Sequence, residues 1–134
     1  VTELFKGKGT VLLVDDEDMV ANVAGQMLEK LGYEVLVARS GKEAIGYYEP
    51  KKDEIDLILL DMIIHDIRGG DVYDRLKEIN PHAKVLLSSG YSMEGLAADI
   101  LRRGCDGFIQ KPFSLQALSG RIREVLEKID DRLS

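Results

Sequence analysis

Three aspartates and a lysine stand directly after short apolar runs of this sequence. Asp15 and Asp16 follow one run, Asp61 ends another, and Lys111 comes just after a third. Carboxylates that lie close together repel one another, and a hard divalent cation with oxygen ligands relieves that repulsion. A carboxylate nucleophile beside such a cation and an ammonium group is suited to accepting a phosphoryl group. This chemistry requires a fold that brings the four residues together.

The spacing of apolar residues predicts strands that alternate with helices. Short apolar runs predict five strands, at residues 11–14, 34–38, 55–60, 84–87 and 107–109. Amphipathic segments predict five helices, at residues 17–31, 40–49, 70–79, 93–103 and 114–129. Such alternation indicates an α/β fold, a doubly wound five-stranded parallel sheet with helices on both faces. We expect tails at residues 1–9 and 132–134 around one domain at residues 10–131.

The helix ends carry recognisable signals. Ser40 with Glu43 three residues later predicts a capping box, and Gly32 is placed to end the first helix. We expect the second helix to end before Pro50.

Ligands of an open α/β sheet bind outside the carboxyl ends of its strands, and the polar residues named above fall there. Ser88 and Ser89 follow the fourth strand and add hydroxyl groups. Each signal alone has a plain alternative: helix capping for the first aspartates, a turn for the serines, and a helix start for Pro112. Asp61 is harder to explain this way, because a charged residue that ends a central apolar strand needs a partner.

The composition limits the classes of function. A length of 134 residues fits one domain, and a net charge of −6 with a pI near 4.9 argues against binding nucleic acid or an anionic membrane. The single Cys105 forms no internal disulfide and is expected to pack in the core. No apolar run approaches the ~20 residues of a membrane span, and residues 1–10 lack a signal-peptide pattern. We therefore expect a cytoplasmic protein.

Four motifs resemble the receiver domain of two-component response regulators, the CheY-like family, over residues 10–129. The motifs are VLLVDDE (11–17), LILLDM (57–62), LLSSGYS (86–92) and GFIQKPF (107–113). Ser89 lies 28 residues after Asp61 and Lys111 lies 50 after it, which suits the family. The resemblance implies a flavodoxin-like (βα)5 fold with strand order 2-1-3-4-5.

The resemblance also implies the roles of the site residues. Asp61 would be the phosphoacceptor, and Lys111 would pair with the phosphoryl oxygens. Mg²⁺ would bind Asp16, Asp61 and the backbone carbonyl of Ile63 directly, and Asp15 largely through water. Such a domain catalyses its own aspartyl phosphorylation and dephosphorylation, so it is not an enzyme in the conventional sense.

Further positions correspond to the family's switch. Ser89 would be the switch hydroxyl, Phe108 the aromatic switch residue, and Pro112 would follow a cis peptide bond. Ile63 and Tyr91 stand two residues after Asp61 and Ser89, where side chains flank the path of the hydrolytic water.

The chain departs from the family at two positions. His65 stands four residues after Asp61, where the family commonly has a proline, and we interpret it as a solvated loop residue. It does not predict zinc binding, because His82 is distant and no ligand spacing is present. Ser89 replaces the commoner threonine and keeps the hydroxyl group.

The expected partner is a histidine kinase or a phosphotransfer domain. An output domain or a second copy would bind the face formed by residues 93–103, 107–109 and 114–129. Both a stand-alone regulator and a receiver from a larger regulator stay open, and the SSGYS stretch favours a hybrid histidine kinase. Two alternatives remain: a nucleotide- or flavin-binding module, which the missing glycine-rich phosphate loops disfavour, and a receiver-like module that is never phosphorylated.

Overall fold

A computed structural model describes residues 7–90 and 95–128, and along them five strands alternate with five helices. The strands are β1 (Thr10–Val14), β2 (Glu34–Ala38), β3 (Leu57–Asp61), β4 (Val85–Ser89) and β5 (Gly107–Gln110). The helices are α1 (Asp18–Lys30), α2 (Gly41–Lys51), α3 (Gly69–Ile79), α4 (Leu96–Arg102) and α5 (Leu115–Glu127).

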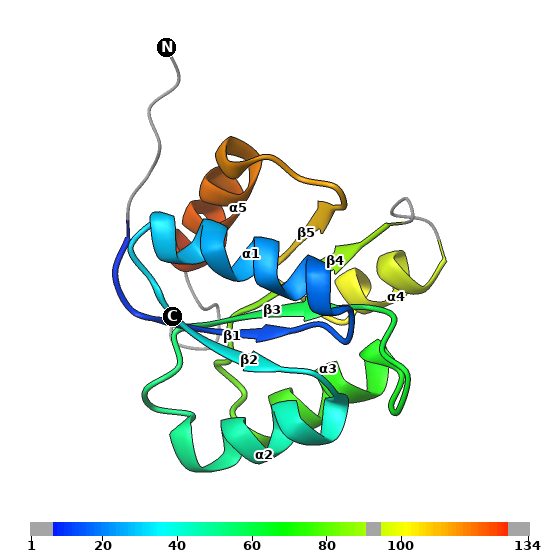
Figure 1. Cartoon of the computed structure of the whole chain (residues 1–134). Coiled ribbons are helices and arrows are strands. Elements are labelled where there is room, and N and C mark those ends of the chain that lie inside the picture. The colour runs from blue at the N-terminus through cyan, green and yellow to red at the C-terminus, as the bar shows by residue number, and fades with distance from the viewer. Residues whose placement is uncertain (1–6, 91–94, 129–134) are drawn as a thin grey trace.

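The strands form one parallel sheet in the order β2-β1-β3-β4-β5. The predicted doubly wound fold and its strand order 2-1-3-4-5 are confirmed. β3 lies at the centre of the sheet, and all five of its residues are buried. Because all strands run the same way, their carboxyl ends meet at one edge of the sheet (Figure 1).

Helices cover both faces of the sheet (Figure 1). On one face, Leu57 and Leu59 of β3 pack with side chains from α1 and α5. On the other face, Ile58 and Leu60 pack with side chains from α2, α3 and α4. The alternation follows from the two-residue period of a strand, and it explains why β3 is apolar throughout.

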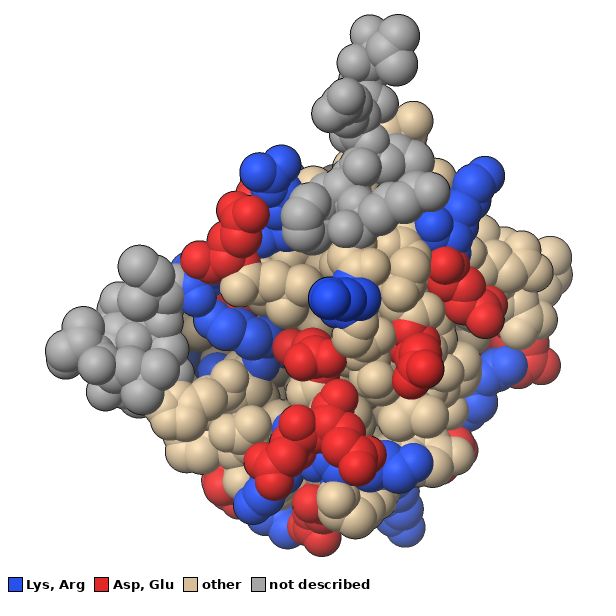
Figure 2. Space-filling model, turned by 90° about the vertical axis from the view of Figure 1, so that its left-hand side faces the viewer, with Lys and Arg blue, Asp and Glu red and all other residues tan. Residues whose placement is uncertain are grey.

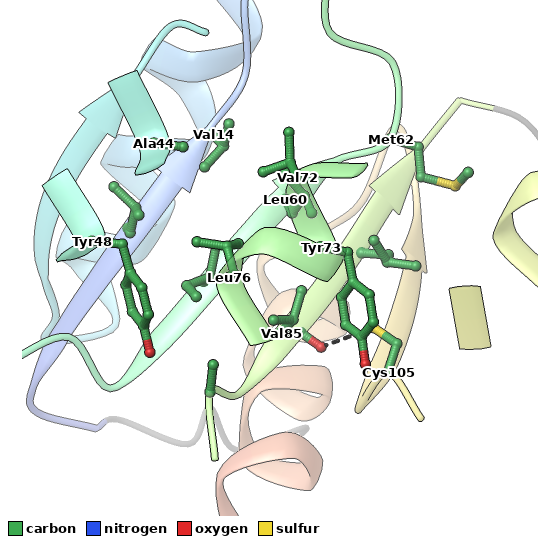
Figure 3. Close-up of a cluster of buried hydrophobic side chains, with 14 of the residues drawn as sticks. Val14, Ala44, Tyr48, Leu60, Met62, Val72, Tyr73, Leu76, Val85 and Cys105 are labelled. Atoms are coloured by element: carbon green, nitrogen blue, oxygen red, sulfur yellow. Dashed lines mark hydrogen bonds between the residues drawn. The ribbon is translucent and has the colours of Figure 1, made fainter. Parts of the chain in front are cut away.

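The core on the α2–α3 side contains large side chains from each layer. Figure 3 shows Tyr48 of α2 and Leu76 of α3 close to the sheet. The Cys105 thiol donates a 3.3 Å hydrogen bond to the Val85 carbonyl oxygen, and burial raises the pKa of this thiol to about 11. Cys105 therefore packs in the core as predicted.

Two helix signals are confirmed. The Ser40 Oγ accepts a 3.0 Å hydrogen bond from the Glu43 backbone N–H and caps α2. Gly32 follows α1 with a φ of +100°, the left-handed conformation that glycine adopts without strain.

The predicted end of the second helix is wrong. α2 continues to Lys51, with Pro50 inside its last turn. A proline removes a single backbone hydrogen bond, the one to the carbonyl four residues earlier at Gly46. That loss is tolerated in the last turn, where only one further helical residue follows.

Several strand boundaries differ from the prediction by one or two residues, most of all in the third and fourth strands. The third strand begins at Leu57 rather than residue 55, and just before it the Asp56 carboxylate accepts a 2.8 Å hydrogen bond from the Thr10 N–H. The fourth strand continues through Ser88 and Ser89, which pair with β3 and β5, so these serines do not form a turn. The predicted helix at residues 93–103 is described from Leu96 onward.

The amino-terminal boundary of the domain stays a prediction, as does the carboxyl-terminal one at residue 131. Gly7 donates its N–H to the Leu31 carbonyl, and the Gly9 carbonyl accepts from Glu34. Gly7 and Gly9 are therefore hydrogen-bonded to the rest of the fold.

Acidic and basic side chains are interspersed at the end of the molecule where the strands begin (Figure 2). Among the described residues in that view, no continuous basic area forms. None of the helices in the described parts of the chain has the length and apolar character needed to cross a membrane.

Candidate functional site

Three carboxylates meet at the carboxyl edge of the sheet. Asp15 and Asp16 follow β1, and Asp61 is the last residue of the neighbouring strand β3. One oxygen of each carboxylate lies within 4.8 Å of the others. The predicted convergence of these residues is thus seen in the structure.

Asp61 is nearly enclosed, with 5% of its surface exposed. Its Oδ1 accepts a 3.3 Å hydrogen bond from the Ile63 N–H, and its Oδ2 lies 3.3 Å from the Lys111 Nζ. The loop after Asp61 is held close, because Gly69 donates its N–H to the Met62 carbonyl. A Cβ at residue 69 would clash with the Met62 backbone, so glycine is needed where α3 begins.

Burial changes the acidity of Asp61. Loss of contact with water raises its pKa from 3.8 to about 6, the charge of Lys111 opposes this effect, and the charge of Asp15 adds to it. At neutral pH the Asp61 carboxyl is therefore still ionised and able to act as a nucleophile, at a cost in folding free energy.

Lys111 joins two of the carboxylates. Its Nζ lies 2.7 Å from the Asp15 Oδ2, in addition to its contact with Asp61. Burial disfavours the ammonium charge, but the hydrogen bond to Asp15 and the charge of Asp61 outweigh burial and raise the pKa of Lys111. The backbone fixes the lysine, since its N–H donates to the Ser89 carbonyl at 2.7 Å and its bond to Pro112 is cis, as the resemblance implied.

The second aspartate has a partner that the sequence did not reveal. The backbone N–H and the ring Nδ1 of His65 both lie 3.0 Å from the Asp16 Oδ2. The prediction that His65 is a solvated loop residue holds for most of its side chain, which is 68% exposed, but misses this contact. No motif could have indicated it, because the two residues are far apart in the sequence.

The remaining predicted site residues differ in their position and burial. Ile63 lies beside it with 55% of its surface exposed, and Ser89 is buried at the end of β4. Phe108 of β5 packs against the core on the α2–α3–α4 side. Tyr91 lies outside the described residues.

The cluster suits a hard cation. All three groups offer carboxylate oxygens, the ligands of Mg²⁺, Ca²⁺ and Mn²⁺. Lys111 neutralises part of their charge, and the partly exposed Asp16 and Ile63 leave an approach from solvent.

Comparison with protein families decides what this arrangement is. The model of the response regulator receiver domain matches residues 11–123. The chain belongs to this family. It is 36% identical over 126 residues to the sensor kinase CckA of Brucella abortus, in an alignment covering 94% of this chain and 13% of CckA.

Other receiver-domain proteins are similar to this chain over nearly their full length. The chemotaxis protein CheY of Thermotoga maritima is 29% identical, with 89% of this chain and 95% of CheY aligned. A crystal structure of a CheX–CheY–BeF3–Mg²⁺ complex from Borrelia burgdorferi is similar with a TM-score of 0.84 and 27% identity, covering 90% of each chain.

Receiver domains accept phosphoryl groups in two-component signalling and interact with histidine kinases and phosphotransfer partners, and this chain is such a domain. It spans less than half the length of several curated relatives, CckA included. Because this chain belongs to the receiver family, the nucleotide- or flavin-binding alternative is disfavoured.

Proposed function

We propose that Asp61 is the phosphoacceptor of this receiver domain. The observation that carries this proposal is a buried carboxylate at the end of the central strand, 3.3 Å from a lysine and beside two further carboxylates. An Asp61 oxygen attacks phosphorus in a phosphohistidine, the phosphorus–nitrogen bond breaks, and the imidazole leaves with the electron pair. Lys111 then pairs with the phosphoryl oxygens and balances their charge.

We propose Mg²⁺ as the cation of this site. Asp16, Asp61 and the carbonyl of Ile63 would hold it directly, and Asp15 through water. When bound, the cation neutralises charge on the phosphoryl oxygens. The fit rests on the donor set of this chain, and the Mg²⁺ named with the Borrelia burgdorferi complex is consistent with it.

Ser89 and Phe108 form the proposed route from the site to the partner surface. Residues alternate in direction along a strand, which places Ser89 on the same face of the sheet as Phe108, and Ser88 on the opposite face. A hydroxyl that moves toward a phosphoryl group on Asp61 would free space on the Phe108 side. The face of α4, β5 and α5 would then change its affinity for an output domain or a second copy.

Phosphorylation should require the cation. With acetyl phosphate and Mg²⁺, we expect intact-mass spectrometry to show one added phosphoryl group per chain, and excess EDTA should abolish it. Calorimetry or amide NMR shifts should report Mg²⁺ binding in the absence of donor. Transfer that is undiminished in EDTA would show that the site works without a metal.

The lifetime of the phosphorylated state should depend on Ile63. This side chain is half exposed beside Asp61, carries no group that orients water, and would hinder an in-line attack. Ile63→Asn should speed hydrolysis roughly 5- to 30-fold, which corresponds to about 1–2 kcal/mol of barrier. Tyr91, replaced by alanine, is expected to act in the same direction.

The decay of phosphorylated protein after removal of the donor measures this effect. Thermal melts of each variant distinguish it from a loss of stability, and Val23→Asn on the exposed surface of α1 is a matched control. Unchanged decay in folded Ile63→Asn would contradict the assigned role.

A further inference from the structure

His65 places two hydrogen-bond donors on one oxygen of Asp16. Its backbone N–H and its ring Nδ1 are both 3.0 Å from the Asp16 Oδ2. A carboxylate only accepts hydrogen bonds, so the ring nitrogen is the donor of this pair. The Asp16 side chain is 20% exposed, so water competes only in part for that oxygen. The second oxygen, Oδ1, has no part in these two bonds.

The loop that carries His65 is held on its other side as well. The Asp66 carboxylate accepts the backbone N–H groups of Gly41 and Lys42, at 2.8 Å and 3.1 Å, at the start of α2. His65 is thereby fixed between α2 and the loop after β1. A proline at position 65 could make neither of the two hydrogen bonds that His65 donates to Asp16, because proline has no N–H and no ring donor.

We infer that His65 is a positioning residue that restricts Asp16 to binding a cation through one oxygen, and so favours Mg²⁺ over Ca²⁺. The inference rests on the proposed function of the aspartate cluster. Mg²⁺ requires near-octahedral geometry with single oxygens, whereas the larger Ca²⁺ accepts carboxylates through both oxygens. Two hydrogen bonds occupy lone pairs of the Asp16 Oδ2, and this disfavours the use of that oxygen as a second ligand. Hydrogen bonds to ligating carboxylates commonly tune metal sites in this way.

Titration of the protein with each cation separately tests the inference. Calorimetry with Mg²⁺ and with Ca²⁺ gives two dissociation constants for the wild type, His65→Ala and His65→Pro. The ratio of Mg²⁺ affinity to Ca²⁺ affinity should fall about tenfold in His65→Pro, which lacks both donors. It should fall by a smaller factor in His65→Ala, which keeps the backbone N–H.

A rescue variant separates positioning from a general effect on folding. Asparagine carries an amide donor close to the place of the imidazole Nδ1, so His65→Asn should restore most of the wild-type ratio. His82→Ala, in the exposed turn after α3, is the matched control and should leave the ratio unchanged. If His65→Pro fails to fold, the alanine and asparagine variants still decide the matter.

An unchanged ratio in folded His65→Ala and His65→Pro would overturn the inference while leaving the metal site intact. A wild type that binds neither cation would instead overturn the proposed function, and the inference with it.

Discussion

Asp61→Asn is expected to abolish phosphorylation by acetyl phosphate, whereas the wild type gains one phosphoryl group of about 80 Da. An amide cannot act as the nucleophile, and it offers a weaker ligand to the cation. Asp15 and Asp16 remain in the variant, but both follow β1, Asp15 is paired with the Lys111 Nζ, and neither ends the central strand β3. Intact-mass spectrometry after incubation with donor and Mg²⁺ measures the result directly.

Asp56→Asn is the matched control for this loss. Asp56 comes just before β3, at the opposite end of the strand from the site, and accepts a hydrogen bond from the Thr10 N–H. Asparagine keeps a carbonyl oxygen for that bond, so the control should fold and gain the full adduct. An equal adduct on Asp61→Asn and on the wild type would show that the acceptor is another residue.

Asp61→Asn should also stabilise the folded protein when no cation is present. Burial raises the pKa of Asp61 from 3.8 to about 6, so ionising this group at neutral pH destabilises the fold. A shift of this size corresponds to about 2–3 kcal/mol, at 1.36 kcal/mol per pKa unit. Asp61→Asn removes that cost, and Lys111 keeps its contact with Asp15. Urea unfolding in EDTA at pH 7 should show the gain.

The stability gained by Asp61→Asn should increase as the pH rises. Because the pKa of Asp61 is higher in the folded state, the folded protein binds more protons than the unfolded chain between about pH 4 and 6. The contribution of Asp61 to wild-type stability therefore falls as the pH rises through this window. The difference between Asp61→Asn and wild type should be near zero below pH 4 and complete above pH 6.

Mg²⁺ should reduce the difference in unfolding free energy between Asp61→Asn and wild type, because it binds the folded wild type more tightly than the variant. Asp56→Asn should show no comparable gain in EDTA. A variant that is no more stable than wild type at pH 7 in EDTA would contradict the assigned cost of burying Asp61.

The sequence allowed the fold and the main contacts of the site to be predicted, because both depend on strand periodicity. Each strand's apolar run ends where its polar residue begins, and parallel pairing brings those ends to one edge. Asp61 and Lys111 are thus placed together by topology alone, although they are 50 residues apart. Ser40 and Gly32 were predictable for a similar reason, since helix caps are local signals.

The contacts that could not be predicted depend on loop conformation. The bonds between His65 and Asp16 require the loop after β3 to lie against the loop after β1, and no periodic pattern encodes that approach. The position of Pro50 within α2 is a further case, in which the context of the last turn outweighs a general rule about proline.

Chemical trapping of the phosphorylated residue tests the central claim most directly. Borohydride reduces an aspartyl phosphate to homoserine, and peptide mass spectrometry locates the converted residue after phosphorylation with Mg²⁺ and donor. We expect homoserine at position 61, and none there when the donor is omitted or EDTA is added. Homoserine at position 15, 16 or 56 in place of 61 would contradict the assignment of Asp61 as the phosphoacceptor.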